Sequence, residues 1–451
     1  MTAMGVTRSG ASRTVLSRLA ILPNRRLPHV LTALGDSRVA AVYLDGQQRA
    51  RNVRSPVNWA NSLLGHRFEI GETFGKSGDR TDEFLARLPA AIATGAGTLY
   101  VQGGVNDLSQ VAGGATRTHA VTGEVINAGN VAAMAMRNLA EIATKARAAG
   151  MIVVLENEVG ADPLTQAAGV AALNDLRRMI FEYGRREPGV FVHDAFGAVM
   201  QSTTATPTFR ASHAYDGIHE NGRGAYFHGK SLARLLATLV PPAQVLSAGM
   251  MDVPANGRRQ LLTNHLFTTT SGGVTVTGIT GNVPGSCAAG LTNATATLST
   301  AANPNGIGNG LQAAIDFSGV GLFRIANALN GASSGAYHAA LQAGDVLEAT
   351  AEIEIVGTPA VLAGVTLDLV AFNGTGGTNT TSVDMNVPTV LTAAEAGPNE
   401  ACTFTLRTRT VTLPASVGAY PFVQAIVRAS STGAGGATII VRQLAIWRRV
   451  G

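Results

Sequence analysis

The chain has 451 residues, of which 46% are hydrophobic and 14% charged, and its formal net charge is +5. This composition fits buried sheets better than disorder, and two domains are the natural expectation for the length. No apolar run reaches the length of a membrane-spanning helix, and no basic stripe interleaved with aromatic residues indicates a nucleic-acid groove. We therefore expect a two-domain protein that neither binds nucleic acid nor inserts into a membrane.

Residues 1–28 contain five arginines and no acidic residue. The arginines interrupt every apolar stretch, whereas a secretory signal peptide needs an uninterrupted apolar core. We therefore expect these residues to form a basic, solvated extension rather than a secretory signal.

Strands and helices alternate from about residue 30 to residue 239. The run 151–155 is continuously apolar, as expected for a parallel strand that is covered on both faces. Further strands are predicted at 31–35, 68–70, 99–101 and 190–192, and helices at 57–64, 131–149, 168–183 and 224–239. This alternation predicts an α/β fold with a parallel sheet in a three-layer α/β/α sandwich.

Pro241 and Pro242 mark a change in texture, because threonine, glycine, alanine, valine and asparagine dominate beyond them. Polar and apolar residues alternate over 346–355, 404–411 and 438–447, which predicts short strands of a β-sandwich. We therefore place one domain at 29–243 and a second at 244–451. Cys287 and Cys402 both lie in the second domain. The sequence is compatible either with a disulfide between them or with two free thiols.

The stretch from Leu31 to Arg38 places Ser37 where the first strand gives way to a helix. A serine there has an exposed hydroxyl close to the backbone N–H groups of a helix N-terminus, which stabilise developing negative charge. A serine also needs a base that takes its proton, and His219 is the best candidate. Asp216 lies three residues before His219, within reach of its Nδ1 atom.

Four short motifs occur in a characteristic order along the first half. They are Gly35-Asp36-Ser37, Gly78 within Lys76–Thr81, Gly104-Val105-Asn106-Asp107, and Asp216-Gly217-Ile218-His219. Together they resemble the four sequence blocks of the SGNH (GDSL-type) hydrolase family, over residues from about 30 to about 239. The resemblance implies a three-layer α/β/α serine esterase that works through an acyl-enzyme.

The resemblance assigns Ser37, His219 and Asp216 to a catalytic triad. It also implies that the backbone N–H groups of Ser37 and Gly78 and the side chain of Asn106 form the oxyanion hole. Gly75 is the competing choice for the glycine, although the surroundings of Gly78 fit the family better. We predict no cofactor and no metal, because no cluster of cysteine and histidine has zinc spacing.

Three charged residues lie beside these motifs. Arg38 follows the nucleophile, where it either helps to bind an anionic or hydroxyl-rich substrate or is solvated in the first helical turn, and the second alternative is favoured. Asp36 and Asp107 are expected to brace their loops through local hydrogen bonds rather than to act on substrate.

The second domain loosely resembles jelly-roll carbohydrate-binding modules, and a plain structural sandwich is about equally favoured. Such an appended module fits an enzyme that removes O-acetyl groups from a polysaccharide. Sugar binding usually needs aromatic faces for stacking. The available aromatic residues are Phe267, Phe317, Tyr337, Phe372, Tyr420 and Trp447, several of which the alternation directs into the core.

Two other functions remain open at this stage. One is a phage virion protein, in the tail or on the capsid surface, that recognises host glycans and carries this hydrolase domain as part of an assembly or homo-oligomer. The other is a small-acyl esterase, lipase or thioesterase of bacterial metabolism. The absence of a recognisable signal peptide fits either a virion protein acting outside the cell or a cytoplasmic enzyme.

Overall fold

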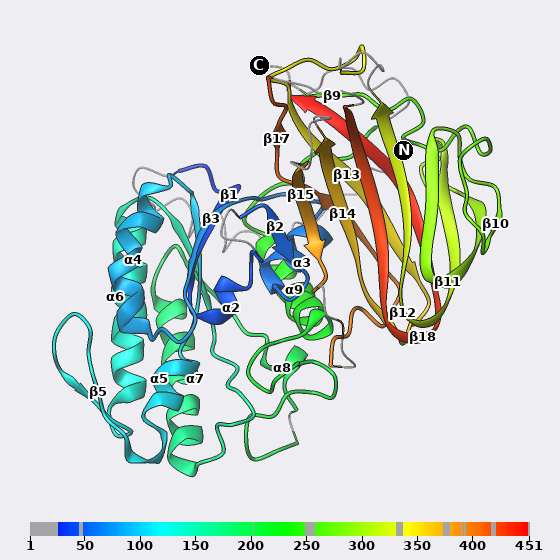
Figure 1. The fold of residues 1–451 in the computed structure, drawn as a ribbon. Coiled ribbons are helices and arrows are strands. Elements are labelled where there is room, and N and C mark those ends of the chain that lie inside the picture. The colour runs from blue at the N-terminus through cyan, green and yellow to red at the C-terminus, as the bar shows by residue number, and fades with distance from the viewer. Residues whose placement is uncertain are drawn as a thin grey trace, which may run out of the picture. The chain divides into compact units, whose positions relative to one another are not determined.

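The structure is a computed structural model that divides into two compact units. It describes residues 26–44, 48–201, 203–248, 258–330, 337–372, 379–388, 391, 394–415 and 421–449. The first unit contains residues 1–42, 67–220 and 227–242, and the second contains residues 43–66, 221–226 and 243–451. Each unit is described by itself (Figure 1).

The first unit is built on a five-stranded, wholly parallel sheet. Its strands lie in the order β3 (Glu69–Gly75), β1 (Val30–Gly35), β4 (Thr98–Gln102), β7 (Ile152–Glu156) and β8 (Val190–His193). Every residue of β4 and β7 is buried, which explains why their sequences are almost continuously apolar. The predicted parallel sheet is confirmed.

Helices supply the outer layers of this unit. Leu139, Ile142 and Ala146 recur at helical spacing and bury one face of α6 against the sheet. The same core takes in Leu99 and Val101 of β4 together with apolar residues of α4 and α7. The helices of this unit are α2 (Ser37–Ala40), α4 (Thr81–Ala93), α5 (Val105–Gln110), the 3₁₀ turn Ala112–Gly114, α6 (Val131–Ala148), α7 (Ala167–Arg186), α8 (Phe196–Val199) and most of α9 (Gly222–Leu236), and a hairpin is formed by β5 (Arg117–Thr118) and β6 (Val125–Ile126).

The carboxyl ends of all five strands meet at one edge because the sheet is parallel. Ser37 follows β1, residues 76–78 follow β3, and Asn106 follows β4. Glu158 follows β7 on the same side. Open α/β sheets bind ligands beyond this edge, so the fold itself gathers the motifs that lie far apart in the sequence.

The second unit is a sandwich-like sheet of eleven strands among the described residues. One path runs β10 (Ile279–Gly281), β11 (Cys287–Ala302), β12 (Asn309–Asn330), β18 (Phe422–Arg449), β14 (Leu362–Phe372), β15 (Asn379–Asn386) and β2 (Ala50–Asn52); β18 also pairs with β9 (Arg258–Gln260) and β13 (Val346–Val356), and β13 pairs with β16 (Cys402–Arg407) and β17 (Val411–Thr412). The predicted β-rich second half is confirmed.

The long strand β18 connects the two parts of this sheet. Residues 422–431 pair with β14, residues 438–448 pair with β13, and β12 runs beside residues 422–441. Gly433, Gly435 and Gly436 lie between the two pairing regions, and Gly435 has a φ of +146°, which side chains rarely adopt. The glycines therefore let one strand pass from one set of partners to the other.

The segment Tyr43–His66 departs from the predicted domain boundaries, because it is grouped with the second unit rather than with residues 29–243. Its strand β2 pairs with β15, and its helix α3 (Pro56–Leu63) buries Trp59 completely. The indole lies 5.2 Å from the rings of both Phe404 and Tyr226. An apolar helix face needs a partner, and the strands of the second unit supply it.

Two further points concern the chain as described. Cys287 is buried and Cys402 half-buried, and no disulfide joins them, so the disulfide alternative is wrong. Among the described residues, no helix combines the length and apolar character needed to cross a membrane.

Candidate active site

The first candidate residue, Ser37, opens the short helix α2. Asp36 is its N-cap, and the Asp36 Oδ1 atom accepts a hydrogen bond of 2.9 Å from the backbone N–H of Arg38. A Cβ atom on Gly35 would lie 2.1 Å from the carbonyl oxygen of Gln102, so only glycine permits β1 and β4 to approach so closely here. In the Gly-Asp-Ser motif, Gly35 therefore permits close packing and Asp36 caps the helix, while Ser37 supplies the hydroxyl.

The structure brings Ser37, His219 and Asp216 together, as predicted. The Nε2 atom of His219 lies 2.7 Å from the Ser37 Oγ atom. The Nδ1 atom of His219 lies 2.7 Å from the Asp216 Oδ2 atom. A serine hydroxyl, an imidazole and a carboxylate in this relay have the geometry for base-assisted attack by the serine.

The loop that carries the histidine is ordered by its own carboxylate. The Asp216 Oδ1 atom accepts hydrogen bonds from the backbone N–H groups of Ile218, at 2.9 Å, and His219, at 2.7 Å. Partial burial alone would raise the pKa of Asp216, but these bonds and the imidazole lower it, so the carboxylate stays ionised. The ring of Tyr215 stacks on the imidazole with centroids 5.6 Å apart, a contact that the sequence did not reveal.

Gly78 and Asn106 lie on two segments that are bonded to each other beside the nucleophile strand. The side-chain amide of Asn106 donates to the carbonyl oxygen of Asp79 at 3.0 Å, and Gln110 of the same helix donates to the carbonyl oxygen of Gly78 at 2.7 Å. The backbone N–H of Lys76 donates to the carbonyl oxygen of Gly35 at 3.1 Å. The loop after β3 is thereby held next to the end of β1.

The two candidate glycines of the second motif differ in their surroundings. Gly78 is exposed, has a φ of +83°, and a Cβ atom there would meet nothing within 4 Å. Gly75 ends β3, where a Cβ atom would lie 2.0 Å from the backbone nitrogen of Ala40 in α2. Gly75 therefore serves close packing, and Gly78 is the glycine whose backbone faces open space.

The prediction that Arg38 is solvated is wrong. Its side chain is buried and its Nη1 atom lies 2.7 Å from the Glu158 Oε1 atom. Its Nη2 atom donates to the carbonyl oxygens of Gly160, at 2.6 Å, and Ile218, at 3.3 Å. A buried guanidinium needs a partner for its charge, and the carboxylate after β7 provides it.

Glu158 is the acceptor at which several segments meet. Besides Arg38, its Oε1 atom accepts the backbone N–H of Gly160 at 2.8 Å, and its Oε2 atom accepts that of Val105 at 3.1 Å. Val105 opens α5, the helix that carries Asn106. Nothing in the sequence marked Glu158, because it belongs to none of the four motifs.

Asp36 and Asp107 brace their loops, as expected. Asp107 accepts hydrogen bonds from the Oγ1 atom of Thr81, at 2.6 Å, and from its backbone N–H, at 3.0 Å. Burial raises the pKa of Asp36 to about 6 and that of Asp107 to about 7, although Arg38 and Thr81 respectively oppose the shift. Both carboxyls hold protons more tightly when folded, so their contribution to stability falls as the pH rises from about 4 towards 7.

A second cluster of ionisable side chains lies at the same edge of the sheet. Glu156, His193 and His228 are buried, and each turns one polar atom towards the other two within 4.8 Å. These are residue types that bind metals, but the Glu156 Oε2 atom lies 2.7 Å from the His193 Nδ1 atom, a hydrogen-bond separation. We therefore assign hydrogen bonds and ion pairs, rather than a metal, to this cluster. Neither histidine belongs to the four sequence motifs.

The comparisons with known proteins agree with the geometry of the first unit. Residues 33–226 match the model of a family described as GDSL-like lipase/acylhydrolase. Enzymes of this description hydrolyse esters, which supports an ester hydrolase. No curated protein sequence matches the chain.

Solved structures resemble parts of the chain. A putative lipolytic protein of the G-D-S-L family from Desulfitobacterium hafniense is 15% identical, with 46% of this chain and 99% of that chain covered and a TM-score of 0.33. The acetyl xylan esterase AlAXEase is 14% identical, with 46% and 98% covered and a TM-score of 0.34. A structure of carbohydrate-binding modules from the β-sandwich superfamily is 16% identical, with 36% and 56% covered and a TM-score of 0.24.

Glu158→Gln should destabilise the first unit and slow ester hydrolysis. The substitution leaves the buried Arg38 guanidinium without its counter-charge, which typically costs about 3–5 kcal/mol. Thermal unfolding and turnover of p-nitrophenyl acetate measure the two effects. Arg178→Gln is the matched control, because it removes an exposed pair with Glu182 and should leave both quantities nearly unchanged. A fully stable Glu158→Gln protein would contradict the importance assigned to this pair.

Proposed function

We propose that this chain, whose residues 33–226 form a GDSL-like lipase/acylhydrolase domain, is a serine esterase that removes small acyl groups, above all O-acetyl groups, from a polysaccharide. The single observation that carries the esterase assignment is the relay from Ser37 through His219 to Asp216, with both separations at 2.7 Å. The relay supports ester hydrolysis in general, and the acetyl group and the polysaccharide are proposed on the further observations below.

The chemistry follows from the relay. His219 takes the proton of Ser37 as the Oγ atom bonds to the ester carbonyl carbon, and the resulting imidazolium is stabilised by Asp216. The negative charge that develops on the carbonyl oxygen is met by the N–H groups of Ser37 and Gly78 and the amide of Asn106. The C–O bond then breaks, His219 gives its proton to the leaving alcohol, and an acyl-serine remains.

Water completes the cycle at the same groups. His219 removes a proton from a water molecule, whose oxygen attacks the acyl carbon, and the proton returns to the Ser37 Oγ atom as the carboxylic acid leaves. The side chain of His219 is 26% exposed and that of Asp216 is 39% exposed, so water reaches the relay. No other group is needed for the reaction to balance.

The rim of the relay supports a small acyl group on a polar substrate. Ser77, Gly78 and Asp216, on the two loops that carry the second motif and the histidine, are exposed, and none of them has an apolar side chain. A rim of small and polar residues contacts a hydrated sugar ester more favourably than a long alkyl chain, whose transfer from water requires apolar walls.

A groove of about 580 Å³ on the second unit supports binding of a hydroxyl-rich polymer. Its lining includes Thr280, Thr297, Thr438 and Asp316, and the first two hydroxyls lie 3.0 Å apart. Threonine hydroxyls and a carboxylate are suitable partners for sugar hydroxyls.

Among the described residues, none of the aromatic residues named from the sequence lines this groove. Phe267, Phe317 and Trp447 are buried in the core, and Tyr420 lies outside the described residues. Tyr337 is half-buried and donates to the carbonyl oxygen of Pro414. Polymer binding by this unit would therefore depend on hydrogen bonds in the threonine groove.

Ser37→Ala should abolish ester hydrolysis, because removing the nucleophile of a triad costs roughly 10⁶ in turnover. His219→Ala should be comparably severe and Asp216→Ala milder. Initial rates on p-nitrophenyl acetate measure the effect, and circular dichroism checks that each variant is folded. Activity of Ser37→Ala close to that of the wild type would remove the assignment.

Acetate esters should be cleaved much faster than octanoate esters. The exposed polar rim gives the longer chain little apolar surface to bury, so each added methylene should bring no gain. A series of p-nitrophenyl esters from two to eight carbons, compared by kcat/KM, measures the preference. A maximum at eight carbons would support a lipase or thioesterase instead.

The double variant Asp316→Ala/Thr297→Val should weaken action on acetylated polysaccharide but not on p-nitrophenyl acetate. We expect KM for the polymer to rise roughly tenfold, equivalent to one or two lost hydrogen bonds. Acetate release at low polymer concentration measures it. Thr300→Val, on the same strand but outside the groove lining, is the control. An unchanged KM in the double variant would exclude this groove as the polymer site.

A further inference from the structure

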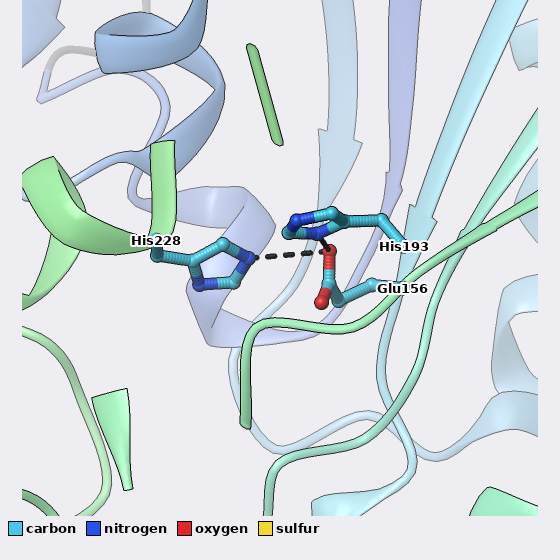
Figure 2. A group of neighbouring side chains, drawn as sticks. All are labelled: Glu156, His193 and His228. Carbon is cyan, nitrogen blue, oxygen red and sulfur yellow. Dashed lines mark hydrogen bonds and ion pairs between the residues drawn. The ribbon is translucent and has the colours of Figure 1, made fainter. Parts of the chain in front are cut away.

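Five buried side chains form one polar network, and Figure 2 shows three of them, Glu156, His193 and His228. Glu156 ends β7, and its Oε2 atom lies 2.7 Å from the His193 Nδ1 atom, 3.1 Å from the Tyr100 hydroxyl and 3.2 Å from the His228 Nε2 atom. His228, on α9, has a second carboxylate partner, because its Nδ1 atom lies 2.8 Å from the Glu220 Oε1 atom. The network thus runs from the sheet edge to the residue that follows His219.

The two contacts of His228, a hydrogen bond to Glu220 and an ion-pair distance to Glu156, favour one protonation state. A neutral imidazole carries one N–H and one lone pair, so either tautomer would turn a lone pair towards a carboxylate. Only the doubly protonated ring presents a positive edge to both Glu220 and Glu156. His193 has no such conflict, because only its Nδ1 atom faces a carboxylate, that of Glu156, while its Nε2 atom lies 3.0 Å from the Ser231 Oγ atom, which can donate or accept.

The surrounding charges favour the same state. Burial alone would lower the pKa of His228, but the carboxylates of Glu220 and Glu156 outweigh burial and raise it to about 10. Burial would raise the pKa of Glu156, whereas the imidazoles of His193 and His228 lower it to about 2. The remaining charged neighbour is Arg38, which interacts with Glu220 and is itself paired with Glu158.

The network ends one residue from the base of the relay. His219 lies between Ile218, whose carbonyl oxygen accepts from Arg38, and Glu220, whose carboxylate is bonded to His228. Glu220 is buried, whereas the rest of the loop from Asp216 to His219 is partly or fully exposed. The exposed base is thus flanked by two residues that are tied to the interior.

We propose that His228 is a buried imidazolium that positions His219, by holding the carboxylate of Glu220 in place. The proposal rests on the esterase function proposed above and deepens it. His228 does not touch the reacting atoms. Its charge balances one of two buried carboxylates, and without that charge Glu220 would move towards water and carry His219 with it.

The protonation state is tested directly in the wild-type protein, independently of activity. Nitrogen-15 NMR of protein with labelled histidines should show one buried ring with both nitrogens protonated from pH 6 to pH 9. The signal is assigned by its loss in His228→Gln. A neutral tautomer of His228 at pH 7 would overturn the proposal, as would one equivalent of metal in the purified protein that is lost in Glu156→Gln.

The positioning role is tested by a charge cycle. At pH 8, His228→Gln should lower kcat on p-nitrophenyl acetate roughly tenfold to a hundredfold, the cost of misplacing a catalytic group by about 1 Å, with KM within about twofold. The ratio of kcat in His228→Gln to kcat in the wild type at the same pH should rise towards pH 6, where protonation of a buried carboxylate removes the unbalanced charge. The double variant Glu220→Gln/His228→Gln should recover activity at pH 8 for the same reason.

His119→Gln is the matched control, because His119 is equally buried but bonds Asn138 and backbone N–H groups rather than carboxylates. It should leave the pH profile of kcat unchanged. Loss in His228→Gln that is the same at every pH and is not relieved in the double variant would show a merely structural role. Inactive Ser37→Ala together with fully active His228→Gln would overturn the positioning role while leaving the esterase assignment intact.

Discussion

The buried ion pair between Arg38 and Glu158 is the interaction on which the rest of the candidate active site depends. Taking two charges out of water is costly, and the cost is offset only where geometry is good and the remaining polar atoms are satisfied. Here Glu158 also accepts the N–H groups of Gly160 and Val105, and Arg38 donates to Gly160 and Ile218. One pair thereby connects the nucleophile helix, the helix of Asn106, the loop after β7 and the loop of His219.

The carboxyl edge of the sheet carries an unusual amount of buried charge for so small a region. Asp36, Asp107, Glu156, Glu158 and Glu220 are all buried there. Bringing these carboxyls together costs folding energy, and natural active sites commonly give up stability in this way for preorganised polar groups. The gain is that a partly exposed loop keeps its imidazole 2.7 Å from the serine hydroxyl.

The motifs of the site and the alternation of strands and helices were predictable because both are local. Ser37, Gly78 and Asn106 each lie within a few residues of a strand end, and a parallel sheet brings strand ends together whatever the loops contain. Asp216 and His219 lie instead in the loop before α9, and their spacing of three residues is itself the local signal. The predicted parallel sheet and β-rich second half are accordingly confirmed. The roles of these five residues stay predictions, and the two distances within the relay support those of Ser37, His219 and Asp216.

What could not be predicted depends on contacts between distant segments. From the sequence, Arg38 is predicted to be a solvated residue in a helical turn. Its ion pair with Glu158 could not be predicted, because no local pattern links the two residues. No local pattern links Glu220 and His228 to Glu156 either, and their interaction is visible only in the folded protein. The segment Tyr43–His66 follows the first strand in sequence, and only the burial of Trp59 against Phe404 shows where it packs.

This last arrangement has a consequence for how the protein is made. Trp59 is synthesised 345 residues before Phe404. At about 5–20 residues per second, it waits tens of seconds for this partner. During that interval the indole lacks the ring that buries it in the folded protein, and it is a target for chaperones that shield apolar surface.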